Sequence, residues 1–154
     1  MSGVKLLVSL CLWMCLATLP AFAVDDTTLS TLIIQTPNSS LSFFTEVAVS
    51  PEAKERGLMF RQVMPEDQAM LFEFSPPQPV QFWMKNTLIS LDIIFVRADG
   101  TIAAIAENAV PKSLDTIGVQ EPVAAVVEIA GGVAKKRGIH KGDHVGGAAF
   151  PALN

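Results

Sequence analysis

The chain has 154 residues, half of them hydrophobic, with 11 basic and 15 acidic side chains and a formal net charge of −4 at pH 7. Nucleic-acid-binding domains need a basic surface for the phosphate backbone, so this acidic balance argues against DNA or RNA as a partner. Both cysteines, Cys11 and Cys15, lie near the N-terminus, so the rest of the chain contains no disulfide, no thiolate metal ligand and no cysteine nucleophile.

Residues 1–23 have the parts of a secretory signal peptide. Lys5 supplies the positive charge, residues 6–19 form an apolar run, and Ala21-Phe22-Ala23 is a small-x-small cleavage site. The run is shorter than the ~20 apolar residues that span a bilayer, and neither cysteine follows the small residue that lipidation requires. We therefore expect an exported protein, in the periplasm by default, that meets the membrane only during export.

After the signal, we expect residues 24–41 to hold a leader (24–30) and a first strand, and residues 42–154 to form one β-rich domain. The prolines at 76, 77 and 79 are expected to end a strand, and Asp99-Gly100 predicts a two-residue hairpin turn. Apolar or alternating runs predict strands at residues 32–34, 42–49, 70–74, 80–85, 93–97, 101–106 and 123–129.

Two short helices are predicted between these strands. Ser50-Pro51-Glu52 has the N-cap, first-turn proline and early acid of a helix start, and Gly57 is a stop signal. The second helix is expected over residues 132–137, with Gly138 as its stop. Seven or eight strands with two short helices predict a mainly β protein built as an antiparallel sandwich or a partly closed barrel. We expect it to be a monomer.

Several motifs, in order and with coherent spacing, resemble the domain-of-unknown-function 192 family from about Phe44 to Val145. The resemblance implies a jelly-roll-like β-sandwich and no particular reaction. Ser90 departs from the proline that is common in the family before its Leu-Asp pair. The resembling motifs are Arg56-Gly57-Leu58-Met59-Phe60-Arg61, Met70-Leu71-Phe72, Phe82-Trp83-Met84-Lys85-Asn86-Thr87, Leu91-Asp92-Ile93-Ile94-Phe95, Glu107-Asn108-Ala109-Val110-Pro111, Val127-Glu128-Ile129-Ala130-Gly131-Gly132 and Gly138-Ile139-His140-Lys141-Gly142-Asp143.

The alternation in residues 80–85 separates core from surface. Phe82 and Met84 share the face expected to be buried, and Trp83 and Lys85 share the other. An exposed Trp83 can stack on a sugar ring or a ligand cation. A Trp83 covered by the next strand or by the proline-rich loop is an equally ordinary arrangement.

Charged residues also occur in or beside apolar strands, where an unpaired charge is costly to bury. One interpretation makes them structural, with Asp92 accepting N–H groups from the 86–90 loop, or Glu128 paired with an arginine. The other makes them a polar pocket of a small binding or interaction module for a carbohydrate or small anionic ligand. The residues of that pocket would be Arg61, Trp83, Lys85, Asn86, Thr87, Asp92, Glu107 and Glu128.

Each side chain has an expected role in this hypothesis. Trp83 would stack, Lys85 and Arg61 would hold an anionic or hydroxylated group, and Asn86, Asp92 and Glu107 would orient it. No motif for a serine nucleophile, a phosphate loop, a dinucleotide or zinc occurs, so we expect no metal and no cofactor, and the sequence favours a non-enzyme.

Two other functions remain open. A carboxylate-dependent hydrolase or lyase acting on cell-envelope carbohydrate requires two of Asp92, Glu107 and Glu128 in one cleft. A purely structural envelope protein would have no small-molecule site at all. The positions of these side chains in a structure would distinguish the binding module, the hydrolase or lyase and the structural protein.

Overall fold

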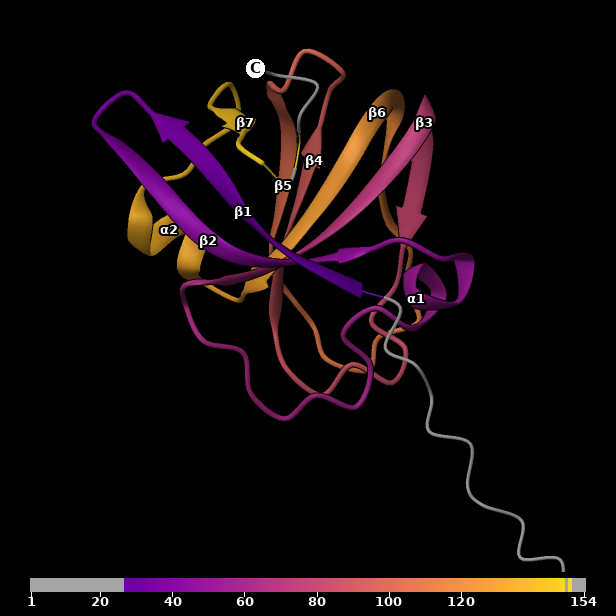
Figure 1. Ribbon diagram of the computed structural model, residues 1–154. Coiled ribbons are helices and arrows are strands. Elements are labelled where there is room, and N and C mark those ends of the chain that lie inside the picture. The colour runs from indigo at the N-terminus through magenta and orange to yellow at the C-terminus, as the bar shows by residue number, and fades with distance from the viewer. Residues whose placement is uncertain (1–26, 149, 151–154) are drawn as a thin grey trace, which may run out of the picture.

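The computed structural model describes residues 27–148 and residue 150, so the expected signal peptide lies outside the described residues. Seven strands form one sheet in the order β5-β4-β6-β3-β2-β1-β7 (Figure 1). The elements are β1 (Thr27–Thr36), β2 (Ser39–Ala48), α1 (Pro51–Arg56), β3 (Gln68–Phe82), β4 (Leu91–Val96), β5 (Ile102–Ala109), β6 (Ile117–Ala130), α2 (Val133–Arg137) and β7 (His144–Gly146).

The sheet curls until its two outer strands meet at one end. β7 pairs with β1, and a bridge from Thr101 to His144 connects it to the start of β5. The N–H of Ile102 also donates to the carbonyl of Asp143 at 2.8 Å. The result is a half-barrel with two short helices, which confirms the mainly β class and the partly closed barrel.

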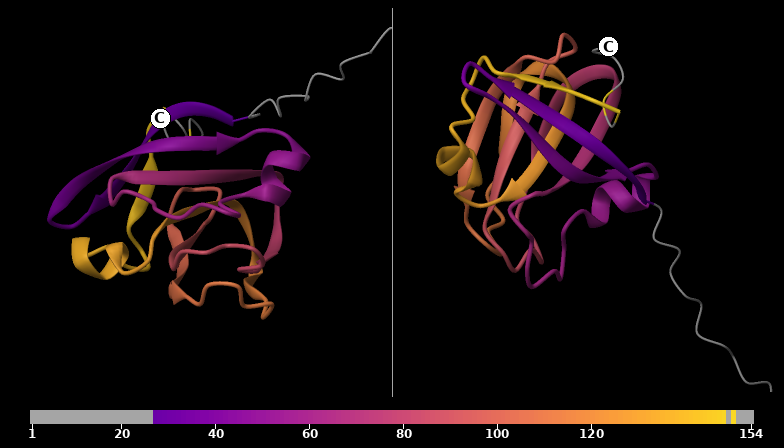
Figure 2. Two further views of the ribbon diagram at one scale, coloured as in Figure 1. Left: turned by 90° about the horizontal axis from the view of Figure 1, so that it is seen from below. Right: turned by 60° about the vertical axis from the view of Figure 1, so that its left-hand side comes forward.

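One strand pair departs from the expected antiparallel pattern, because β2 and β3 run parallel. Parallel neighbours need a crossover of a dozen or more residues, and residues 49–67 provide it. Helix α1 lies within this crossover. The two helices lie far apart in all three views (Figures 1 and 2).

The prediction that the prolines end a strand is wrong. β3 runs through them, and its register with β6 shifts between Glu73 and Gln78 and again between Gln78 and Val80. A proline only lacks its own N–H, so an irregular stretch with shifted pairing accommodates it without ending the strand. Two strands also begin earlier than predicted. β1 includes the last four residues of the expected 24–30 leader, and β6 begins at Ile117 and not at residue 123.

Both faces of the sheet are covered, and each has its own core. Ile94, Val127 and Ile129 belong to one buried cluster, whereas Ile93 and Val126 belong to the other. All six residues of β4 are buried as a consequence, which explains why five of them, all except Asp92, are apolar. The second cluster includes Leu58, just after α1, and this second face carries the candidate site described below.

Candidate functional site

Asp92 anchors the fold and lines neither of the two pockets described below. Its side chain is fully buried and accepts backbone N–H groups from Asn108 at 2.8 Å, Gly132 at 3.0 Å and Ala134 at 2.8 Å. The last two donors belong to the first turn of α2, whose N-cap Gly132 offers no side-chain acceptor. Asp92 therefore caps α2 from a distant strand, because the N–H groups of a helix start need an acceptor. The expected donors, in the 86–90 loop, do not supply these bonds.

The strand register explains why Asp92 and Glu128 do not share a site. Asp92 pairs with Ile129, and Ile93 pairs with Glu128, so the two carboxyl side chains lie on opposite faces of the sheet. Asp92 is on the face of the core covered by α2, and Glu128 is on the other face. The hypothesis of one pocket containing both is wrong for this reason.

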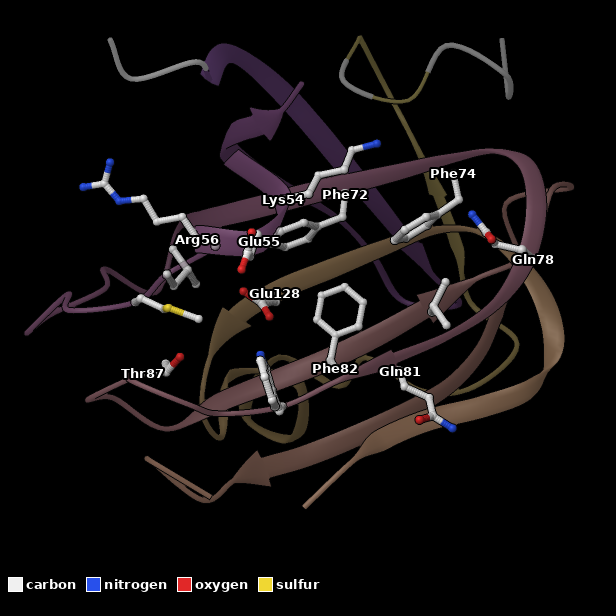
Figure 3. Close-up of a pocket in the computed structure, with 15 residues that line it drawn as sticks. Lys54, Glu55, Arg56, Phe72, Phe74, Gln78, Gln81, Phe82, Thr87 and Glu128 are labelled. Carbon is white, nitrogen blue, oxygen red and sulfur yellow. The ribbon is translucent and has the colours of Figure 1, made fainter. Parts of the chain in front are cut away.

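Glu128 opens on to a pocket of about 460 Å³ between α1, β3 and β6, here called the α1 pocket. Figure 3 shows the side chains that surround it. The α1 pocket is lined by residues 54–59, by Phe72, Phe74, Gln78, Val80, Gln81 and Phe82 of β3, and by Trp83, Thr87 and Glu128.

Aromatic rings form much of the wall of the α1 pocket. Phe82 packs edge to face against Phe72, with centroids 5.2 Å apart and planes at 80°, and against Phe74 at 6.5 Å and 87°. Edge-to-face packing is an arrangement that aromatic pairs favour. Trp83 is 45% exposed, so neither the next strand nor the proline-rich stretch covers it, and its ring is available to a ligand.

Glu128 is the unusual polar group of the α1 pocket. The residue is only 5% exposed, and no described residue donates a hydrogen bond to its carboxyl group or forms an ion pair with it. Every wholly enclosed side-chain N or O atom of the described residues has a partner, so the carboxyl oxygens of Glu128 must reach the pocket space. Burial raises the pKa of Glu128 to about 8, since a low-dielectric setting disfavours the charged form. The expected pairing with an arginine does not occur.

Gly57 keeps the wall beside Glu128 thin. This C-cap of α1 has a φ of +48°, which side chains rarely adopt. A Cβ added there would lie 3.4 Å from the Phe72 ring and 4.0 Å from Oε2 of Glu128. Glycine at this position therefore meets the backbone requirement of the helix end and leaves the carboxyl accessible.

The basic side chains at the rim extend away from Glu128 (Figure 3). Lys54 donates from Nζ to the carbonyl oxygen of Glu73 at 2.5 Å and lies 5.5 Å from the centre of the Phe74 ring. Arg56 extends outward from the end of α1. The pKa of Glu128 is raised by burial alone, so neither cation compensates its charge.

A second, shallower pocket of about 290 Å³ adjoins the first across Trp83. Glu52, Glu55, Arg56, Met59, Trp83, Lys85 and Asn86 line it. Lys85 holds its Nζ 4.9 Å from the centre of the Trp83 ring, a cation–π distance. The carbonyl of Asn86 accepts the N–H of Phe60 at 2.9 Å, which joins the loop after Trp83 to the loop after α1.

The eight side chains predicted as one site are thus distributed over several environments. Trp83, Thr87 and Glu128 line the α1 pocket, and Lys85 and Asn86 line the second pocket with Trp83. Arg61 forms a two-pronged ion pair with Glu46, Asp92 is enclosed, and the exposed Glu107 lines neither pocket.

Sequence reasoning missed most of the pocket wall. Residues 54–57 were interpreted as the end of a helix, and Phe72 and Phe74 as part of a strand. Arg56, Gly57 and Phe72 also belong to the resembling motifs, but none of these residues was predicted to line a site. The signal that indicated the site was Glu128 itself, a carboxyl on a face shared with Val126, which is buried. A charge in that position, without an arginine fixed beside it, indicates either a hidden ion pair or a site.

Two classes of feature are absent from the part of the chain that the structure describes. Within residues 27–148 and 150, no three His, Cys, Asp or Glu side chains are grouped so that they would hold a metal ion. Among the same residues, no helix has the length and apolar character needed to cross a bilayer.

Comparison with known proteins identifies a family for most of the chain. Residues 33–147 match the model of DUF192, described as an uncharacterized ACR. No curated protein matches the chain.

Two crystal structures share the fold. One is a protein of unknown function from Novosphingobium aromaticivorans DSM 12444, with 37% identity, a TM-score of 0.75, and coverage of 77% of this chain and 84% of that one. The other is described as a putative transcription regulator from Sinorhizobium meliloti 1021, with 40% identity, a TM-score of 0.78, and coverage of 81% and 98%.

Proposed function

The chain belongs to the DUF192 family, and we propose that it is an exported binding module whose small-molecule ligand occupies the α1 pocket. The observation that carries the proposal is Glu128, a buried carboxyl that has no partner among the described residues and faces an aromatic-lined space. Sites for small molecules measure ~300–1,000 Å³ and combine apolar walls with a few polar groups. The α1 pocket, at about 460 Å³, has this size and composition.

The wall chemistry indicates how a ligand would sit. Phe82 and Trp83 offer ring surface for an apolar or ring-shaped body. Glu128 offers the polar group that fixes its orientation, and the hydroxyl of Thr87 and the amide of Gln81 lie in the same wall. A small anionic ligand fits this wall poorly, because Arg61, one of the two basic residues expected to hold it, is already paired with Glu46 and the two basic side chains of the pocket extend away from its interior.

The hydrolase or lyase alternative loses its structural requirement. It needs two of three carboxyls in one cleft, and Asp92 is committed to three backbone N–H groups while Glu107 lies outside the pockets. A purely structural protein is expected to have no concave polar site. The α1 pocket with Glu128 is such a site and therefore argues against this alternative.

Binding to DNA is not part of the proposal. The Sinorhizobium protein is described as a putative transcription regulator, but a formal charge of −4 gives this chain little of the phosphate attraction on which DNA binding depends. Export, proposed from residues 1–23, would also separate the protein from the chromosome.

A ligand screen by thermal shift tests the function. Amines, alcohols, sugars and carboxylates would be compared on the wild type, on Trp83→Ala and on Phe44→Ala, which removes an aromatic ring that is 70% exposed on β2, outside both pockets. A ligand specific for the folded state raises the melting temperature by mass action. We expect hits on the wild type and Phe44→Ala that weaken on Trp83→Ala. The proposal fails if no compound binds, or if every shift survives the loss of Trp83.

A further inference from the structure

We propose that the ligand of the α1 pocket carries a protonated amine that pairs with the carboxylate of Glu128. This inference rests on the proposed function and specifies its ligand class. Glu128 is 5% exposed, receives no hydrogen bond from the described residues, and still reaches the pocket space. A buried carboxyl can hold a charge only when a partner compensates it, and here the position open to such a partner is the pocket itself.

The walls around Glu128 suit an ammonium group with an apolar body. Phe72 and Phe82 lie beside the carboxyl (Figure 3), and Trp83 completes the aromatic lining. A ring face attracts a cation through its quadrupole and also packs against carbon. Aromatic rings next to a carboxylate therefore favour a cationic ligand over a neutral or anionic one of equal size.

The other charged groups of the pocket also favour a positively charged ligand. Its remaining titratable groups are Lys54, Glu55 and Arg56, all from α1, and the pocket residues of β3 contribute none. Lys54 is bonded to the carbonyl of Glu73, and both basic side chains extend away from Glu128. Glu55, an exposed residue of α1, adds a carboxylate to the lining, and neither basic side chain of the pocket is directed at Glu128.

Proton exchange distinguishes an ammonium ligand from other classes. With a pKa of about 8, Glu128 is mostly protonated at pH 7 in the free protein. An ammonium requires the ionised form, so binding at pH 7 should release about one proton. Below pH 8 the ionised fraction falls about tenfold per pH unit, and ammonium affinity should fall with it. A neutral alcohol would show no such release.

Three matched probes test the inference: 2-phenylethylammonium, 2-phenylethanol and phenylacetate, which share a ring and differ in the charge of the head group. Titration calorimetry at pH 6, 7 and 8, in buffers of different ionisation enthalpy, measures affinity and proton release. We expect the ammonium to bind tightest, with affinity rising about tenfold from pH 6 to 7. Glu128→Gln should weaken it at least tenfold at pH 8 and remove the pH dependence. Glu107→Gln, an exposed carboxyl outside the pockets, should change neither.

Each result decides the inference. Equal or tighter binding of the alcohol or of phenylacetate, or ammonium binding without proton release, would overturn the amine assignment and leave the binding function standing. Failure of all three probes overturns the assignment as well, and the thermal-shift screen then decides the binding function separately. The wild-type pH series is informative even if Glu128→Gln does not fold.

Discussion

Asp92 and Glu128 are buried carboxyl groups on adjacent strands with opposite surroundings. Asp92 accepts three backbone N–H groups, and a carboxylate in such a position stabilises the fold through charge-assisted hydrogen bonds. Glu128 has no such donor, and its burial is unfavourable for the charged form. At the scale of single residues, one carboxyl therefore contributes to stability through its donors, and the other lies in a pocket without donors.

Replacing Asp92 with Asn should be strongly destabilising. The variant keeps the shape but turns one acceptor oxygen into an NH₂ donor, so at least one backbone N–H faces another donor. We expect a loss of about 3 kcal/mol in the free energy of unfolding, measured by urea titration. Glu107→Gln is the control and should change stability by less than about 0.5 kcal/mol. A similar, small loss in both variants would contradict the anchoring role of Asp92.

Glu128 should make the protein less stable as the pH rises. Its pKa is about 8 in the fold against an ordinary 4.5, so between these values the folded state holds a proton that the unfolded state has lost. The contribution is fully present below pH 4.5 and is lost through pH 8, with a slope near 1.4 kcal/mol per pH unit.

The measurement is the difference in unfolding free energy between Glu128→Gln and the wild type at pH 5, 6, 7 and 8. The neutral glutamine should become progressively more stabilising as the pH rises. A difference that does not vary with pH would mean that Glu128 is ionised in the folded protein. Asp99 and Glu121 have lowered pKa values, which also make stability depend on pH. Their contribution is the same in both proteins and cancels in the difference.

At the scale of elements, α1 determines whether the pocket exists. It is only six residues long, and the Ser50 hydroxyl accepts the N–H of Ala53 at 3.1 Å to cap it. Ser50→Ala should lower stability by about 1 kcal/mol and weaken any ligand of the α1 pocket, because α1 forms one of its walls. Ser50→Asp retains an acceptor and should restore both. Weakened binding that persists in Ser50→Asp would show that the hydroxyl acts in some other way.

Local signals predicted the elements whose determinants are local. The cap and proline at the start of α1 and the glycine stops of both helices follow from capping chemistry, and the structure confirms them. The hairpin at Asp99-Gly100 is also present, but its turn is longer than the predicted two residues, because Arg97 bonds to Thr101 across three residues. The predicted end of β3 at the prolines was wrong. The strand continues there because it pairs with β6, more than forty residues later in the sequence. The parallel β2–β3 pair is likewise a consequence of distant contacts and has no signature in either strand.

At the scale of the whole molecule, the site was predictable only in part. Alternation correctly placed Met84 in the core and Trp83 outside it. The register between strands decides which charged side chains lie close together, and a single sequence does not reveal that register. Asp92 and Glu128 were therefore predicted in one pocket, although the register puts them on opposite faces of the sheet. The partner of Arg61 is Glu46 on β2, a pairing that requires the crossover to be known.

Export is a property of the full chain that fractionation tests. Expressed in a Gram-negative host, the protein should appear in the periplasmic fraction with Val24 as its first residue, identified by mass spectrometry. Replacing Ala23 with a bulky residue should block processing after that position. An intact N-terminus on soluble cytoplasmic protein would contradict the export proposal.

The central claim is that the α1 pocket receives a ligand cation at Glu128. A crystal structure of the protein with 2-phenylethylammonium at pH 8 tests it most directly. We predict the ammonium nitrogen within ~3 Å of a Glu128 carboxyl oxygen, with the phenyl ring against Phe82 and Trp83. A ligand bound elsewhere, or bound in the α1 pocket with its nitrogen turned away from Glu128, would contradict the claim.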